Sequence, residues 1–160
     1  MDPKALIAAL DSSQLFFERS TSALTEADSD YAPKEGMFSA AASVMHVALT
    51  IDWFIEGAFE RKEGFSMDFE AHDKEARGCK SLAAARARLK RCYDRARSVI
   101  GRQTSASLLT PLPPGPVMGG APRLAIVGGI EDHTAHHRGA LTVYARLLDR
   151  VPPMPYMDPM

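Results

Sequence analysis

The chain has 160 residues, with 19 basic and 20 acidic side chains and a formal net charge of −1 at pH 7 when its five histidines are neutral. A hydrophobic content of 46% and a charged content of 24% exclude disordered and collagen-like proteins and suit one globular domain, which we expect to span residues 1–160. The near-neutral total gives no general attraction to nucleic acid, and no stretch reaches the roughly 18 apolar residues of a membrane span, so we expect neither partner.

The two cysteines, Cys79 and Cys92, are too few for a disulfide framework, which favours a reducing compartment. The first residues, Met1 to Lys4, lack the basic and apolar regions of a signal peptide. We therefore expect a cytoplasmic protein.

Charge is unevenly distributed along the chain. Residues 1–73 carry five basic and fourteen acidic groups, a balance of −9, whereas residues 74–102 carry ten basic and two acidic groups, a balance of +8. We interpret the basic segment as a solvated helix face that pairs with acidic neighbours elsewhere in the fold. A docking surface for an anionic partner is the alternative interpretation.

The first predicted helix runs from about residue 3 to residue 25. Asp2 is a suitable N-cap and Pro3 a suitable first helical residue, and apolar side chains recur at helical spacing from Leu6 to Leu24. The acidic, proline-containing residues 26–36 then form a connection.

The second predicted helix, residues 39–59, is apolar around most of its circumference, so we expect it to be buried centrally. Residues 60–79 are mixed and charged, with room for a crossover or a short helix. The third helix, residues 81–101, carries apolar residues at alternating steps of three and four, the spacing of a seam in a helical bundle. Cys92 lies on this seam, and we interpret it as a small core residue.

The segment 103–122 contains four prolines between residues 111 and 116 and three glycines, which predicts a loop without regular helix. Loops of this length are often functional, and we expect this one to border the site. The final helix, from residue 122 or 123 to about 149, ends before the proline-rich tail 151–156. Because no strand-like alternation occurs, the predicted fold class is all-α with four main helices.

His133 and His137 are the strongest functional signal in the sequence. They lie four residues apart, so on a helix they stack on one face and can share one metal ion. The same face continues through Ile126 and Tyr144, which turns both imidazoles toward the core. His136 lies about 100° around the helix from His137 and does not suit the same ion.

Two ligands rarely make a tight site, and His46 is the candidate for the third. It lies in the middle of the apolar helix 39–59, where an imidazole without a partner would cost about 1–3 kcal/mol. A metal ion would satisfy it, although a hydrogen-bonded core histidine is the simpler alternative. His72 lies in a charged segment that we expect to be exposed, and we interpret it as incidental.

Other residues near the cluster are weaker candidates. Glu131 and Asp132 flank it, where they can hold the ligands through hydrogen bonds or merely favour the early part of the helix. We expect Gly139 to allow a close contact between helices. No nucleophile elbow, reactive-cysteine context or phosphate-binding loop is present.

Three segments of the chain resemble the DinB/YfiT-like superfamily. The first, residues 33–39, leads into a helix with a central histidine, His46, and a following aromatic residue, Trp53. The second is His133-Thr134-Ala135-His136-His137-Arg138-Gly139, the superfamily's strongest local signature. The third is the tail 151–156, so that the resemblance covers nearly the whole chain in the right order.

The resemblance implies a four-helix bundle with long crossover connections, often a homodimer. It also implies one divalent ion, commonly nickel or zinc, on three histidines, which correspond here to His46, His133 and His137. The glutamine that usually follows the signature's glycine is Ala140 in this chain, a departure that does not touch the proposed ligands.

Two enzyme functions follow from an open ion on three imidazoles. The first is a metal-dependent hydrolase that activates water toward an unknown small substrate. The second, implied by the resemblance, is a low-molecular-weight-thiol-dependent S-transferase or isomerase, with arginines of helix 81–101 as candidate partners for the thiol's carboxylates. A non-catalytic, metal-stabilised protein for binding or stress response is the third alternative. Asp52 and Glu56 are conceivable general bases, but both lie off the His46 face, so no catalytic residue is assigned.

Overall fold

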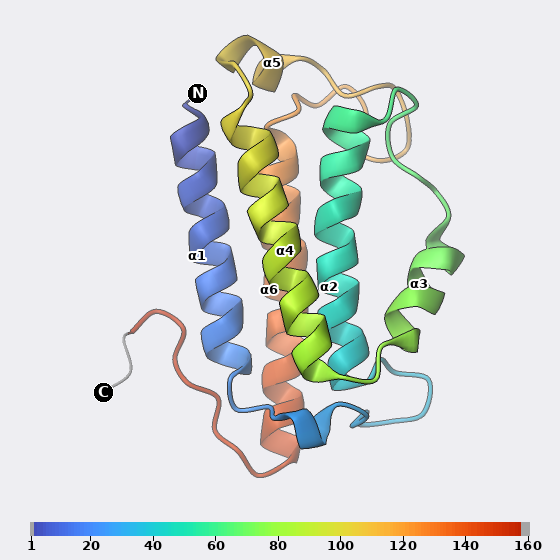
Figure 1. Cartoon of the computed structure of the whole chain (residues 1–160), viewed down its shortest axis with the longest axis vertical. Coiled ribbons are helices and arrows are strands. Elements are labelled where there is room, and N and C mark those ends of the chain that lie inside the picture. Colours follow the sequence, from blue (N-terminus) through green and yellow to red (C-terminus); the bar gives the residue numbers. More distant parts are fainter. Residues whose placement is uncertain (1, 158–160) are drawn as a thin grey trace.

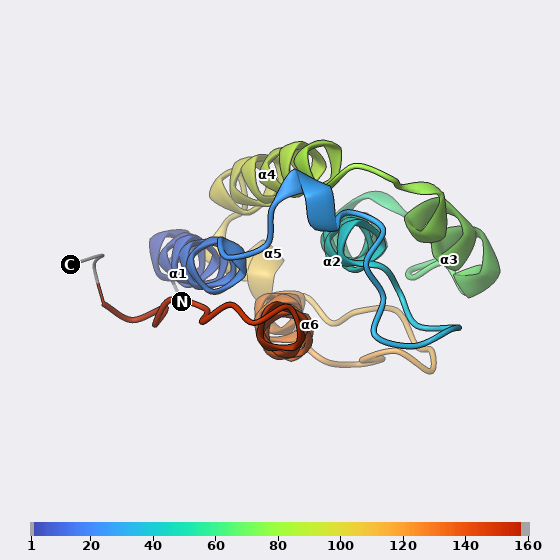
Figure 2. The ribbon, with the colours of Figure 1, turned by 90° about the horizontal axis from the view of Figure 1, so that it is seen from below.

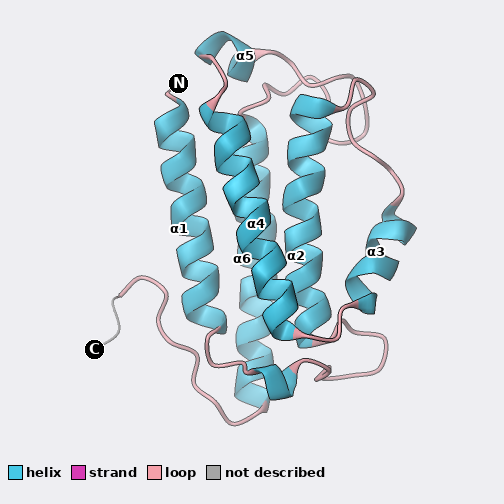
Figure 3. Cartoon of the chain, in the orientation of Figure 1, coloured by secondary structure: helices cyan, strands magenta, loops and turns pink. Residues whose placement is uncertain are grey.

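The computed structural model describes residues 2–157, which form helices and no β-strand (Figure 3). The long helices are α1 (Pro3–Thr21), α2 (Ala40–Ile55), α4 (Leu82–Gly101) and α6 (Ala125–Leu147). The shorter ones are η1 (Glu26–Asp28), η2 (Glu56–Glu60), α3 (Phe69–Gly78) and α5 (Ser105–Leu109). The predicted all-α class is therefore confirmed. None of the helices within residues 2–157 combines the length and apolarity that a membrane crossing requires.

The long helices stand side by side, one at each corner of a rough square in the end view (Figure 2). Helices α1 and α2 lie at opposite corners, and each packs against both α4 and α6. Helices α2 and α4 run in the same direction, so the chain must travel back along the fold between them (Figure 1). Residues 61–81 make this return and include α3, which lies outside the square against α2.

Local side-chain chemistry determines where the helices begin and end. Three of the four long helices have an N-cap side chain that accepts a hydrogen bond from a backbone amide in the first turn: Asp2, Ser39 and Ser81. Helix α1 ends at Thr21, before the predicted residue 25, because Thr25 and Asp28 form a capping box that starts η1. The α-helical part of α2 ends at Ile55, and the last predicted turn is the π-helix η2 instead.

The prediction that residues 103–122 lack regular helix is wrong for α5. Thr104 caps this short helix by accepting a hydrogen bond from the amide of Ser107, and Leu108 is fully buried in the core. The chain therefore completes one helical turn before the run of prolines begins at Pro111.

The core contains the residues that were predicted to face it. All six seam residues of α4 are buried: Leu82, Ala85, Leu89, Cys92, Ala96 and Val99. Burial raises the pKa of the Cys92 thiol to about 12, so this cysteine is an unreactive core residue. Tyr93 is also fully buried, and its hydroxyl lies 2.9 Å from Ser13 Oγ and 3.3 Å from Thr134 Oγ1, joining α4 to α1 and α6.

Basic residues of α4 pair with acidic side chains on its neighbours. Asp52 of α2 lies 2.8 Å from Arg88 and 2.9 Å from Arg95, which also pairs with two glutamates of η2. Arg97 contacts Asp11 of α1 at 2.6 Å. For these residues the interpretation of a paired face is confirmed, whereas docking of an anionic partner stays a prediction.

Candidate metal centre

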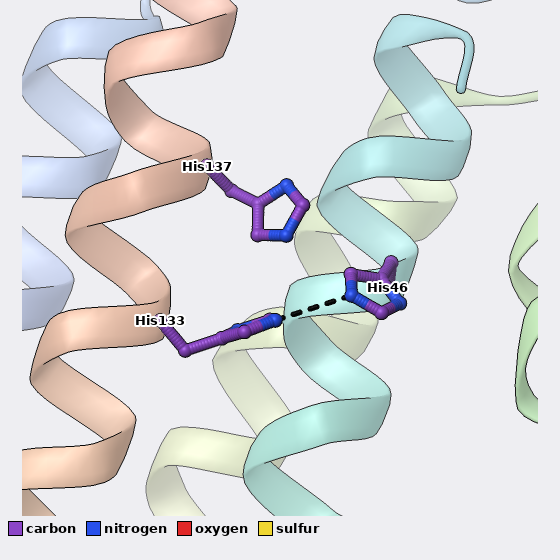
Figure 4. Close-up of side chains that lie close together, drawn as sticks. All are labelled: His46, His133 and His137. Atoms are coloured by element: carbon purple, nitrogen blue, oxygen red, sulfur yellow. Dashed lines mark hydrogen bonds between the residues drawn. The ribbon is translucent and has the colours of Figure 1, made fainter. Parts of the chain in front are cut away.

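Three histidines from two helices converge on one point between α2 and α6 (Figure 4). His46 comes from α2, and His133 and His137 come from α6; one ring nitrogen of each lies within 4.8 Å of the others. The Nε2 atoms of His46 and His133 are 3.1 Å apart. Two ligands about 2.0–2.1 Å from a tetrahedral ion lie about 3.4 Å from each other, so this trio is close to the spacing of a three-histidine metal site.

The sequence of α6 explains why two of the rings share a face. His133 and His137 are one turn apart, and the same side of the helix buries Ile126 and Ile130 against the core. Gly129 lets α6 approach α2, because a Cβ at this position would lie 2.9 Å from the ring of Phe54.

The expectation that Gly139 allows a close helix contact is wrong. Gly139 is exposed, and an added Cβ would meet nothing within 4 Å. The close approach belongs to Gly129, ten residues earlier on α6, where the neighbour is an aromatic ring.

Burial keeps the three imidazoles neutral. It is the largest cause in each case: it lowers the pKa of His133 to about 3, with further lowering from the charges of His137 and His46. It lowers the pKa of His137 to about 4, again assisted by His46. The pKa of His46 is also lowered by burial, although the nearby Asp73 opposes the shift. Neutral imidazole is the form that ligates metal ions, so the environment favours the ligating state.

Neighbouring side chains hold the rings in place. Ser43 Oγ lies 3.4 Å from Nδ1 of His137, which leaves the other nitrogen of that ring to face the cluster. The ring of Phe38 stacks on His46 with centroids 5.1 Å apart and an interplanar angle of 28°. The guanidinium of Arg77 lies over the ring of Phe38, 4.4 Å from its centroid.

Several flanking residues lie apart from the cluster. His136 is exposed, as expected from its angle on the helix, and does not join the converging trio. Asp132 is exposed, and Glu131 lines a separate cavity with Arg138, so neither is placed to orient the ligands. Asp52 faces α4, where it pairs with arginines.

A cavity of about 420 Å³ opens beside the histidines. Its lining residues come from α2, α3, α6 and the segment before α2: Phe38, His46, Thr50, Trp53, Phe54, Phe69, His72, Asp73 and His133. Two of the three converging histidines are part of this wall, so an ion held by the trio would be reached from the cavity. His137 does not line it.

The expectation that His72 lies in an exposed segment is wrong, whereas its being incidental to function stays an interpretation. His72 is half-buried and lines the cavity together with Asp73. The available signal was the helical register of α3, because His72 lies four residues before Ala76, the buried residue of that helix. A face with a buried residue must pack on another element, and α3 packs on α2.

The proline-rich loop, which we expected to border the site, does not line this cavity. Residues 113–117 of the proline-rich loop instead line a smaller cavity of about 150 Å³ with residues 63–65 and Met67. The arginines of α4 are also absent from the histidine cavity, since Arg88 and Arg95 are paired with Asp52. The basic helix is therefore not placed to bind the carboxylates of a thiol in this cavity.

Comparison with known families gives one match. The family model described as the DinB superfamily matches residues 9–141, which is most of the chain and includes all three converging histidines. A comparison with curated proteins finds no match. The expected homodimer and cytoplasmic location stay predictions.

Proposed function

The chain belongs to the DinB superfamily, and from this premise we propose that it binds one divalent ion, nickel or zinc, through His46, His133 and His137 and hydrolyses a small substrate. One observation carries the proposal: three ring nitrogens from separate turns of two helices lie within 4.8 Å of one another beside a cavity of about 420 Å³. A cluster of this kind is what a catalytic metal site with an open position requires.

The residues around the cluster fit such an ion. Three neutral ligands leave a divalent ion its full charge, and an ion of this kind acts as a Lewis acid that can lower the pKa of a bound water toward about 7. The chain supplies the rest of the environment: Ser43 orients His137, and Phe38 stacks on His46.

The architecture of the superfamily is part of the proposal. The four long helices and the return segment 61–81 support a four-helix bundle with long crossover connections. We also propose the homodimer that the superfamily resemblance implies. Light scattering of the purified protein tests it, and a mass of 17.4 kDa would contradict it.

Metal content tests the site. Purified protein loaded with zinc or nickel should retain about one ion per chain, and His46→Ala, His133→Ala and His137→Ala should each lose it. His136→Ala is the matched control, because this neighbouring histidine is exposed and lies outside the cluster. Equal metal content in all four variants would contradict the site.

Activity tests the reaction. Loaded wild-type protein should hydrolyse members of an ester, amide and lactone panel at rates above those of the metal-free protein and of His133→Ala. Retention of one ion without hydrolysis of any member would favour the non-catalytic alternative, in which the ion serves binding or stability.

A further inference from the structure

The walls of the histidine cavity are aromatic. Apart from the histidines they present the rings of Phe38, Trp53, Phe54 and Phe69. The ring centroids of Trp53 and Phe54 are 5.0 Å apart, and those of Trp53 and Phe69 are 6.1 Å apart, so three of the rings form one continuous surface. An aromatic surface of this kind suits an apolar or aromatic ligand.

The polar atoms in these walls are already used. Trp53 donates its indole N–H to the carbonyl of Ser66 at 2.7 Å. Thr50 donates its hydroxyl to the carbonyl of His46 at 2.9 Å, which leaves the oxygen turned to its own helix. A ligand entering the cavity therefore meets few free hydrogen-bonding groups besides the histidines, His72 and Asp73.

The charges at the rim do not favour an anion. No lysine or arginine within residues 2–157 lines the cavity, whereas Asp73 does. Arg77 of α3 is engaged by Asp73 at 2.7 Å, by the carbonyl of Gly36 at 3.2 Å and by the ring of Phe38. A ligand carboxylate would therefore meet no lysine or arginine in the cavity wall and would face the carboxylate of Asp73.

We propose that this cavity binds small molecules with one metal-ligating head group and an uncharged aromatic body, and that it discriminates against polyanionic thiols. The proposal rests on the function proposed above, since the head group is held by the same ion. A cavity of about 150 Å³ holds one benzene ring, so about 420 Å³ accommodates a substituted ring. This class of ligand separates the chain from transferases that use a carboxylate-rich thiol.

Trp53 is the sole tryptophan of the chain and lies in the wall, so its fluorescence reports on the cavity directly. Three probes separate the contributions of the thiol, the aromatic ring and the anionic charge to binding. Benzyl mercaptan has a thiol and a ring, ethylbenzene has the ring alone, and glutathione has a thiol on an anionic body. With zinc-loaded protein under anaerobic conditions, benzyl mercaptan should bind at least about tenfold more tightly than glutathione, because only its body gains from apolar burial. Equal or tighter binding of glutathione would overturn the proposal.

Two variants and one control show whether the probes bind in this cavity. Thr50→Leu fills the cavity from a helical position whose hydroxyl bonds only its own backbone, so it should weaken benzyl mercaptan and ethylbenzene about tenfold while metal content stays at one ion per chain. Asp73→Lys should strengthen the binding of glutathione. Glu75→Lys should not, because Glu75 is an exposed residue of the same helix outside the cavity. Unchanged ring binding in Thr50→Leu, or equal gains in both lysine variants, would contradict the proposed cavity.

The same measurements distinguish failure of this proposal from failure of the metal site. Ethylbenzene needs no ion, so it should quench Trp53 in metal-free protein as well. If elemental analysis finds no metal but ethylbenzene binds and Thr50→Leu abolishes it, the metal site fails and the aromatic cavity stands. If one ion is bound but the three probes bind alike, the aromatic selectivity fails and the metal site stands.

Discussion

Helix α2 carries Asp52 on one face and His46 on another, and the surroundings of these two polar side chains differ. Asp52 faces α4 and is 8% exposed; its carboxylate lies 2.8 Å from Arg88, 2.9 Å from Arg95 and 3.2 Å from the Sγ of Cys92. His46 faces α6, where its Nε2 meets the Nε2 of His133 at 3.1 Å beside an open cavity.

The difference lies in what completes each cluster. Two cations from the protein itself pair with the Asp52 carboxylate, and we call this cluster closed. The histidine cluster brings together nitrogen lone pairs and no protein cation within the described chain, and it opens to a cavity. The Asp52 cluster is therefore structural, whereas three neutral imidazoles that converge beside a cavity are a candidate binding site.

The largest expected effect concerns the open cluster. Zinc should stabilise the metal-free protein by about 4 kcal/mol at a free concentration of about 1,000 times Kd, because it binds the folded chain and not the unfolded one. His133→Ala should abolish this gain. Chemical denaturation with and without zinc measures it, and an equal gain in the variant would place the metal elsewhere.

The Asp52 cluster should affect the stability of the fold and not its metal content. Asp52→Ala leaves Arg88 and Arg95 without their shared anion, so the free energy of unfolding should fall by about 2–4 kcal/mol, with metal content unchanged. Glu60→Ala is the control, because it removes an exposed partner of Arg95 and should cost no more than about 1 kcal/mol. Loss of metal in Asp52→Ala would erase the distinction between the two faces.

A second closed cluster gives a pH dependence. The hydrogen bond from Arg150 is the main cause that lowers the pKa of Asp28 below its usual 3.8. A lowered folded-state pKa means stability that is present above the unfolded pKa and lost as pH falls through the folded one.

Asp28→Asn should therefore be less stable than wild type by about 1–2 kcal/mol at pH 7, and the difference should shrink below about pH 4. Urea unfolding at several pH values measures this. A difference that persists unchanged at pH 2 would show that the charge of Asp28 is not responsible.

The smallest expected effect is on the orientation of a ligand. Ser43→Ala removes the partner of His137 Nδ1, and affinity for zinc should fall by about tenfold, the lower end for a residue that orients a metal ligand, because the contact is long at 3.4 Å. Competition with a chelator measures the affinity. Ser98→Ala, an exposed change on α4, should leave it unchanged.

Local periodicity predicted that His133 and His137 share a face, and the resemblance to the superfamily supported His46 as their partner. The spacing of His133 and His137 and the apolar surroundings of His46 determine which way each ring faces once the helices form. The buried seam of α4 followed from the same kind of regularity, and Cys92 behaves as that seam predicts.

The cavity could not be predicted in the same way. His72 reaches it only because the return segment lays α3 against α2, a contact between distant parts of the chain. The early end of α1 depends on the side chains of Thr25 and Asp28, and α5 depends on the burial of Leu108. Hydrophobic periodicity carries no information about these tertiary and capping interactions.

The two helices that supply the histidines lie far apart along the chain, and His46 and His133 are 87 positions apart. An isolated α6 can offer an ion only the pair that its own helical turn brings together. The third ligand comes from α2, so the complete trio exists only where α2 packs against α6, a contact between distant parts of the chain. Tight metal uptake would then report that α2 and α6 are packed together, which neither helix could report alone.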